Sequence, residues 1–238
     1  PSTHQATTQN QESPTKKQKQ AEKGSYQIIE SLSLLKPLCQ LLKTGFAFDL
    51  ETTSLNPIDA QIVGISISQS EKKAFYIPLN SYLAAEQGDL FNPQKPTQQT
   101  NPILALLKPI FEDESIPKIL HNSKYDMAIL ARYDIYLKGL AFDTYIAAHL
   151  LEKPKLGLKA LSQTELGLDY DDFESTLKEA RVDSFEELPY EIASNYACLD
   201  ADATYRLYGL FKDTMDQQFA KLFYDIELKL VPILVYME

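Results

Sequence analysis

Four acidic residues and one tyrosine fall in three short segments whose residue types could hold metal ions against a phosphodiester. They are Asp49 and Glu51, then Asp126, then Tyr196 and Asp200. Hydrolysis of a phosphodiester needs a nucleophile made from water and charge stabilisation on the attacking and leaving oxygens, which two nearby metal ions supply together. Carboxylate oxygens suit magnesium or manganese. We therefore expect two divalent metal ions, Mg²⁺ or Mn²⁺, at these residues.

Zinc and thiol chemistry find no support in the sequence. The only cysteines are Cys39 and Cys198, and the histidines are His4, His121 and His149. None of them has the spacing of a zinc site. Two widely separated cysteines agree with a reducing cytoplasm.

The first acidic pair ends a segment that alternates as a β-strand does. Apolar residues occupy every second position from Phe46 to Leu50, so Asp49 and Glu51 should project together from the other face. Taken alone, the pair is equally compatible with a strand that leads into the turn beginning at Thr52.

Asp126 follows a short apolar strand predicted over residues 116–120 and falls in the first turn of a helix predicted over 125–133. Ser123 and Asp126 have the spacing of a capping box, and the helix dipole favours an acid in the first turn. A capping role and a metal-binding role are both open for Asp126.

Tyr196 and Asp200 lie four residues apart in a helix predicted over residues 189–214, so they share a face. The alternative is a packed aromatic residue beside a solvated acid. Asp202 points elsewhere, and we expect it to belong to the plain surface of this helix.

Together, Asp49-Leu50-Glu51, Asn122-x3-Asp126 and Tyr196-x3-Asp200 resemble the three motifs of the DEDD 3′–5′ exonucleases, in the tyrosine subgroup. The resemblance spans roughly residues 26–223 and includes Phe142-Asp143-Thr144, between the second and third motifs. More closely, the chain is similar to the proofreading exonuclease domains of bacterial family-A DNA polymerases, the polymerase I type.

The resemblance implies roles for the motif residues. Asp49, Glu51 and Asp200 would hold the metal that activates water, and Asp49 would bridge to a second metal that Asp126 reaches through water. Tyr196 would position the attacking water, because a phenol with a pKa of about 10 is a poor base at neutral pH. The products would be nucleoside 5′-monophosphates released from a 3′ end.

Three further residues match positions that contact the substrate in this family. Leu55 would be an apolar wedge against the terminal bases, Asn122 a strand-contacting amide and Phe173 a stacking aromatic. Each of the three could equally pack in the core or in a loop.

The implied fold is α/β, a ribonuclease H-like mixed sheet flanked by helices. Strands predicted over residues 46–51, 62–68 and 74–77 could form an antiparallel meander, followed by helices over 103–111, 125–133, 143–151 and 189–214 and a short strand near Leu140. Residues 80–101 read as a long polar loop.

Three sections of the chain are expected. Residues 1–23, rich in Gln, Thr, Ser and Lys, are predicted to be a disordered linker or tag remnant. Residues 24–223 form the exonuclease domain. Residues 224–238 resemble the start of the helix that connects such a domain to its covalently attached polymerase domain.

The composition of the chain limits how it can bind nucleic acid and membranes. The net charge is −10, and residues 1–23 carry more Lys than Glu, so the remainder is more acidic still. Phosphate contacts dominate nucleic-acid affinity, so we expect weak capture of single-stranded DNA 3′ ends or frayed primer termini, assisted by the polymerase domain. The absence of a long apolar run predicts no membrane span, and we expect a cytoplasmic monomer.

Two other functions remain open from the sequence. A stand-alone RNA 3′-end exonuclease of the ribonuclease D or Werner type would carry the same five residues. A module of another class would be catalytically silent and only brace a polymerase, although all four acids and the tyrosine are present here.

Overall fold

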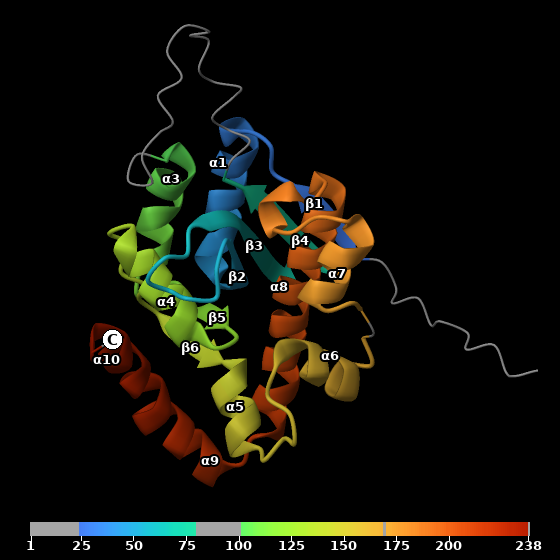
Figure 1. The fold of residues 1–238 in the computed structure, drawn as a ribbon. Helices are drawn as coiled ribbons and strands as arrows, with labels where there is room; N and C mark the ends of the chain where they lie inside the picture. The colour runs from blue at the N-terminus through green and yellow to red at the C-terminus, as the bar shows by residue number, and fades with distance from the viewer. Residues whose placement is uncertain (1–23, 80–100, 169, 238) are drawn as a thin grey trace, which may run out of the picture.

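A six-stranded mixed sheet forms the centre of the molecule (Figure 1). The structure, a computed structural model, describes residues 24–79, 101–168 and 170–237. The strands lie in the order β1-β4-β3-β2-β5-β6. Their bounds are β1 (Ser25–Ile28), β2 (Phe46–Thr52), β3 (Ile62–Ser70), β4 (Lys73–Pro78), β5 (Lys118–Leu120) and β6 (Leu140–Asp143).

The pairing of the strands brings the ends of β2, β5 and β6 to one edge. Strands β2, β3 and β4 pair antiparallel, which confirms the predicted meander, whereas β5 pairs parallel with both β2 and β6. The carboxyl ends of parallel strands meet at the same edge of a sheet, which is where ligands bind in open α/β sheets. The acidic pair of β2 and the segments that follow β5 and β6 therefore lie close together.

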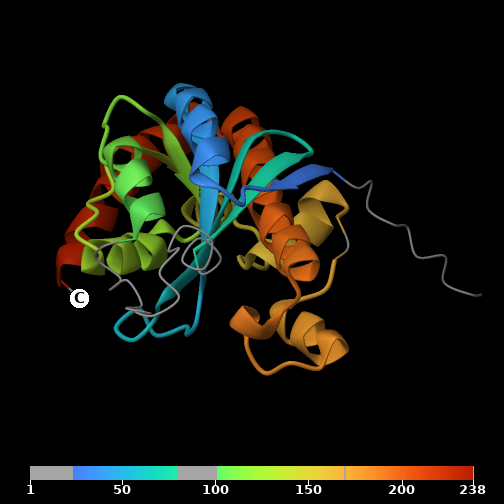
Figure 2. The ribbon, with the colours of Figure 1, turned by 90° about the horizontal axis from the view of Figure 1, so that it is seen from above.

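Helices cover both faces of the sheet (Figure 2). Helices α1, α3 and α4 pack on one face, and the long helix α8 crosses the other. The helices are α1 (Leu32–Leu41), α3 (Pro102–Phe111), α4 (Ser123–Arg132), α5 (Thr144–Leu150), α6 (Leu158–Leu166), α7 (Phe173–Ala180), α8 (Tyr190–Thr214), α9 (Gln217–Leu222) and α10 (Leu228–Met237), with short 3-10 turns η1 (Leu42–Thr44) and η3 (Phe185–Glu187) and a π-helical turn η4 (Phe223–Glu227).

The alternation of β2 places its two faces in different surroundings. Phe46, Phe48 and Leu50 are buried in the core beneath α1, α3 and α4. Ala47 faces the opposite core, which Leu207 of α8 helps to form. Because side chains alternate along a strand, the acids of β2 lie on the face that α8 covers. The predicted separation of the two acids from Phe46, Phe48 and Leu50 is confirmed.

The predicted strands and helices are confirmed, with small shifts at their ends. The sequence pattern missed β1, α1, α6, α7 and α9. Strand β1 has four residues and α1 contains Pro37, and a short element or an internal proline weakens the periodic signal. Segments 1–23 and 80–100 lie outside the described residues. Among the described helices, none is both long and apolar enough to cross a membrane.

Candidate metal and nuclease site

Three carboxylates meet between the sheet and α8. Asp49 and Glu51 project from β2, and Asp200 projects from α8. One side-chain oxygen from each lies within 4.8 Å of the other two. We call these three residues the carboxylate cluster. The structure thus brings together three of the four acids that the sequence singled out.

Asp126 lies beside this cluster, but its carboxylate is not among the three whose oxygens meet. Its Oδ1 accepts a hydrogen bond of 3.2 Å from the amide of Leu50, the residue between the two acids of β2. Burial, followed by the charge of Asp49, raises the pKa of Asp126 well above its ordinary value. The fourth acid is therefore close enough to Asp49 for their charges to interact.

Burial and the mutual repulsion of its members disfavour the charged forms of the carboxylate cluster, and burial is the larger cause. Burial raises the pKa of Asp49 to about 7, and the charge of Asp200 adds to this rise. The pKa of Glu51 is also raised well above its ordinary value, by burial and then by Asp49 and Asp200. Like charges held together in a buried site disfavour ionisation.

The donor set fits a hard divalent cation. Oε1 of Glu51 is buried without a hydrogen-bond partner, one of two such side-chain atoms in the described part of the chain. A buried carboxylate oxygen without a partner is costly, and a bound cation would satisfy it. Carboxylate oxygens are the ligands that Mg²⁺ and Mn²⁺ prefer.

Tyr196 lies at the border of this cluster, one helical turn before Asp200. Burial, and then the charge of Asp200, raises the pKa of the Tyr196 phenol well above its ordinary value. The rings of Phe173 and Phe185 pack edge-on against it, each with a centroid distance of 6.2 Å. The phenol is therefore a protonated hydrogen-bond donor in a fixed aromatic setting.

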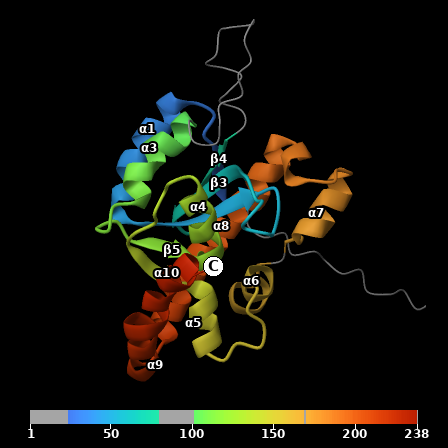
Figure 3. The ribbon, with the colours of Figure 1, turned by 60° about the vertical axis from the view of Figure 1, so that its left-hand side comes forward.

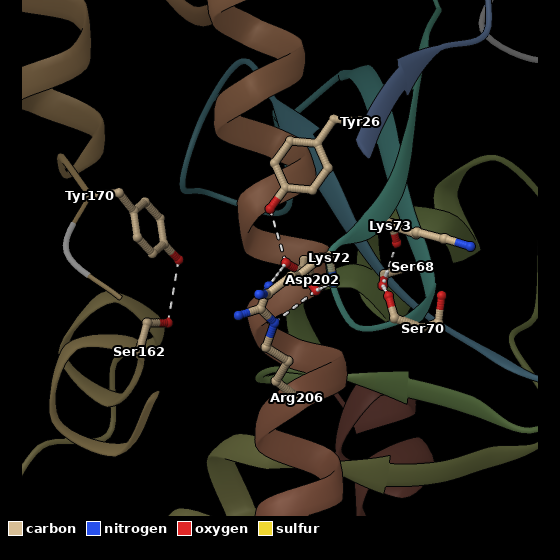
Figure 4. Close-up of polar contacts among 9 residues, drawn as sticks. All are labelled: Tyr26, Ser68, Ser70, Lys72, Lys73, Ser162, Tyr170, Asp202 and Arg206. Carbon is tan, nitrogen blue, oxygen red and sulfur yellow. Dashed lines mark hydrogen bonds and ion pairs between the residues drawn. The ribbon is translucent and has the colours of Figure 1, made fainter. Parts of the chain in front are cut away.

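Two residues that contact Asp200 lie outside every motif found in the sequence. Lys159 of α6 forms an ion pair with Asp200. The hydroxyl of Tyr170 donates a 2.8 Å hydrogen bond to Oδ1 of Asp200, and it lies 3.4 Å from Oγ of Ser162 (Figure 4). A single lysine and a single tyrosine outside any motif become recognisable only when the fold places them beside α8.

The capping box expected at Ser123 is absent. Asn122 is the N-cap of α4, in the left-handed conformation with φ 61° and ψ 50°. Asp143, at the end of β6, accepts hydrogen bonds from the amide of Ser123 at 2.7 Å and from its hydroxyl at 2.6 Å. Asp143 therefore caps α4 across the chain, and Asp126 is left to face Asp49.

The expectation that Asp202 belongs to the plain surface is wrong. Asp202 is fully buried, and its carboxylate accepts hydrogen bonds from the Tyr26 hydroxyl at 2.9 Å, the Lys72 amide at 2.7 Å and Nε of Arg206 at 3.0 Å (Figure 4). Two residues turn a helix by about 200°, so Asp202 does point away from Asp200. That direction leads to β1 and the β3–β4 turn rather than to solvent.

The three predicted substrate contacts are all exposed, and one of them, Phe173, packs against Tyr196. Leu55, in the β2–β3 loop, is 92% exposed, so it does not pack in the core. That loop runs between α4 and α7 (Figure 3). Phe173, the first residue of α7, is 38% exposed and also packs against Tyr196. The side chain of Asn122 is exposed at the start of α4. Their roles toward a substrate stay predictions.

Known proteins resemble this chain over most of its length. Residues 26–216 match the family described as 3′–5′ exonuclease. DNA polymerase I of Chloroflexus aurantiacus is 35% identical over 227 residues, which cover 92% of this chain and 23% of that protein. DNA polymerase I of Pseudomonas aeruginosa is 34% identical over 201 residues, 81% of this chain and 21% of that protein. The chain thus spans less than a quarter of these relatives.

Solved structures show the same fold at lower sequence identity. Escherichia coli RNase D has a TM-score of 0.59 and 20% identity, covering 89% of this chain and 50% of that one. Brucella melitensis NrnC has a TM-score of 0.59 and 21% identity, covering 90% and 92%. Pol1 from M. smegmatis has a TM-score of 0.64 and 20% identity, covering 89% and 31%. The predicted ribonuclease H-like mixed sheet flanked by helices is confirmed.

Proposed function

The chain belongs to the 3′–5′ exonuclease family of DNA polymerase I, and from this premise we propose that it proofreads, removing nucleotides one at a time from DNA 3′ ends. The observation that carries the proposal is the meeting of Asp49, Glu51 and Asp200 within 4.8 Å, with a buried Glu51 oxygen that lacks a partner. A family match indicates a nuclease, and this arrangement supplies the charge that a metal-dependent nuclease needs.

In this proposal the carboxylate cluster would hold a divalent ion, and Asp126, whose charge interacts with Asp49, would help to hold a second. Divalent ions bound there would supply activated water and stabilise the leaving 3′ oxygen. Tyr196 orients the attacking water as a hydrogen-bond donor, because its raised pKa keeps it protonated. The released products are nucleoside 5′-monophosphates.

Exposed residues around the cluster position the DNA end in this proposal. Leu55 wedges against the terminal bases and Phe173 stacks on one of them, which suits a proofreader because stacking tolerates any base. Asn122 contacts the strand from the start of α4.

The net charge of the chain and the greater length of its relatives support two partners in this proposal, a DNA 3′ end and an attached polymerase domain. The net charge of −10 supports weak capture of single-stranded ends or frayed primer termini. A covalently attached polymerase domain, as in the relatives, would raise the local concentration of such ends. In this proposal residues 24–223 are the exonuclease domain of a cytoplasmic monomer, and residues 224–238 begin the connection. The exposed Ile233 and Leu234 of α10 support a further packing partner there.

The test is a time course on 5′-labelled single-stranded DNA and matched RNA, with Mg²⁺, Mn²⁺ or EDTA. We expect stepwise shortening of DNA that EDTA abolishes. Asp49→Ala should lower the rate at least about 1000-fold, since metal charge stabilisation is worth several kcal/mol. Asp213→Ala, which removes an exposed acid from the same helix as Asp200, should leave the rate unchanged.

Two outcomes would contradict the proposal. Preferential shortening of RNA would identify an RNA 3′-end exonuclease. No metal-dependent shortening of either substrate would favour a silent module that braces a polymerase.

A further inference from the structure

Lys159 brings a positive charge to the carboxylate cluster, and the chemistry proposed above does not use it. It is the second residue of α6 and forms an ion pair with Asp200. Its Nζ lies 3.9 Å from the ring centroids of both Tyr170 and Tyr196. The two rings and the carboxylate thus hold the ammonium by ion pairing and by cation–π attraction.

The ammonium acts on the whole cluster rather than on Asp200 alone. Its charge lowers the pKa of both Asp49 and Glu51, against the effect of burial. Oδ1 of Asp200 accepts from Lys159 and also from the Tyr170 hydroxyl. A carboxylate oxygen has two lone-pair sites, so these two donors occupy both acceptor sites of Oδ1.

We propose that Lys159 is the counter-cation of the carboxylate cluster in the metal-free protein, and that it must leave Asp200 before a divalent ion binds there. The inference rests on the proposed function, because it concerns the same metal site. An ammonium and a divalent ion on one carboxylate repel each other and draw on the same negative charge. Metal binding is then an exchange of cations, and Lys159 weakens it.

The side chain of Lys159 is suited to such an exchange. It is 25% exposed, so a path to solvent exists, whereas the side chain of Asp200 is only 8% exposed. Lysine carries a compact charge on a flexible four-carbon stem and makes no fixed bidentate contact. The ammonium can therefore withdraw while α6 stays in place.

The test measures Mn²⁺ binding to the 238-residue chain by electron paramagnetic resonance, and the melting temperature with EDTA. Lys159→Met keeps the length of the stem and removes the charge. We expect it to bind Mn²⁺ at least about tenfold more tightly than the native chain. Without metal it should melt at a lower temperature, because the clustered carboxylates lose their cation. Lys159→Gln is a second neutral variant if the Met variant does not fold.

Lys153→Met is the matched control. Lys153 pairs with Glu165 at 2.7 Å, and its Nζ lies 5.7 Å from the ring centroid of Phe211, so it has the same kinds of contact away from the cluster. Its removal should leave Mn²⁺ affinity unchanged.

Equal or weaker Mn²⁺ binding by the neutral Lys159 variants, with a native chain that does bind Mn²⁺, overturns the inference and leaves the proposed function standing. If neither the native chain nor the variants bind Mn²⁺, the metal site and the inference both fail.

Discussion

At the scale of single residues, substitution of Tyr196 tests whether its phenol orients the attacking water or removes a proton from it. Burial and Asp200 raise its pKa far above the assay range, so the phenol donates a hydrogen bond and does not take a proton. Tyr196→Phe should slow single-turnover cleavage about 100-fold by the same factor at every pH from about 7 to 9.5. Tyr190→Phe, on an exposed tyrosine of the same helix, is the control. A ratio of native to variant rate that grows with pH would instead identify a base.

Substitution of Asp202 should weaken folding and leave metal binding intact. We expect the opposite for Asp200, two positions earlier. Asp202→Ala leaves the guanidinium of Arg206, only 12% exposed, without its partner. Loss of one member of a buried ion pair costs about 3–5 kcal/mol, so the free energy of unfolding in urea should fall by that amount. Mn²⁺ affinity should hold, whereas Asp200→Ala should lose it with less effect on folding. Loss of Mn²⁺ binding in a folded Asp202→Ala would contradict this division.

The sequence predicts some site residues and not others for a physical reason. Alternation in β2 and the four-residue spacing in α8 define the faces on which Asp49, Glu51 and Asp200 lie. Helical spacing also placed Asp202 on another face, but what covers that face depends on β1. Lys159 reaches Asp200 only through the packing of α6 on α8, which no local pattern encodes.

At the scale of elements, one carboxylate joins the starts of two helices. Besides capping α4, Asp143 is the N-cap of α5, accepting from the amides of Tyr145 at 2.9 Å and Ile146 at 3.2 Å. Helices α4 and α5 therefore begin at the same side chain, at the strand ends that carry the site. This shared cap holds the start of α4, and Asp126 with it, in position beside β2.

Asp143→Ala should cost about 1–4 kcal/mol of unfolding free energy, because one N-cap is worth roughly 0.5–2 kcal/mol and two are lost. Asp172→Ala is the comparison, since Asp172 caps only α7 with one bond of 2.8 Å to the Ser175 amide. It should cost about 1 kcal/mol. Equal losses in urea unfolding would show that the shared cap adds nothing.

Elements with a strongly periodic apolar pattern could be predicted from the sequence, whereas β1, α1, α6, α7 and α9 could not. The meander and α8 repeat their apolar pattern over enough residues to be read from the sequence. The start of α4 was misread because its cap comes from Asp143, some 20 positions along the chain. Capping boxes are local signals, so a cap supplied from another strand leaves none in the sequence.

At the scale of the whole molecule, the metal site and the stability of the fold oppose each other. Without metal, burial holds the pKa of Asp49 at about 7, above the unfolded value of about 3.9, and raises those of Glu51 and Asp126. The folded protein then binds more protons than the unfolded chain between these values. Its stability must fall as pH rises through this window.

This linkage predicts that the melting temperatures with and without metal diverge as pH rises. In EDTA, the melting temperature should fall between about pH 5.5 and 7.5, and Asp49→Asn should flatten that slope. With saturating Mn²⁺ the gain in melting temperature over EDTA should grow across the same window, because ligands bind the ion deprotonated. Differential scanning fluorimetry measures both curves. Parallel curves would mean that the buried acids do not bind the ion.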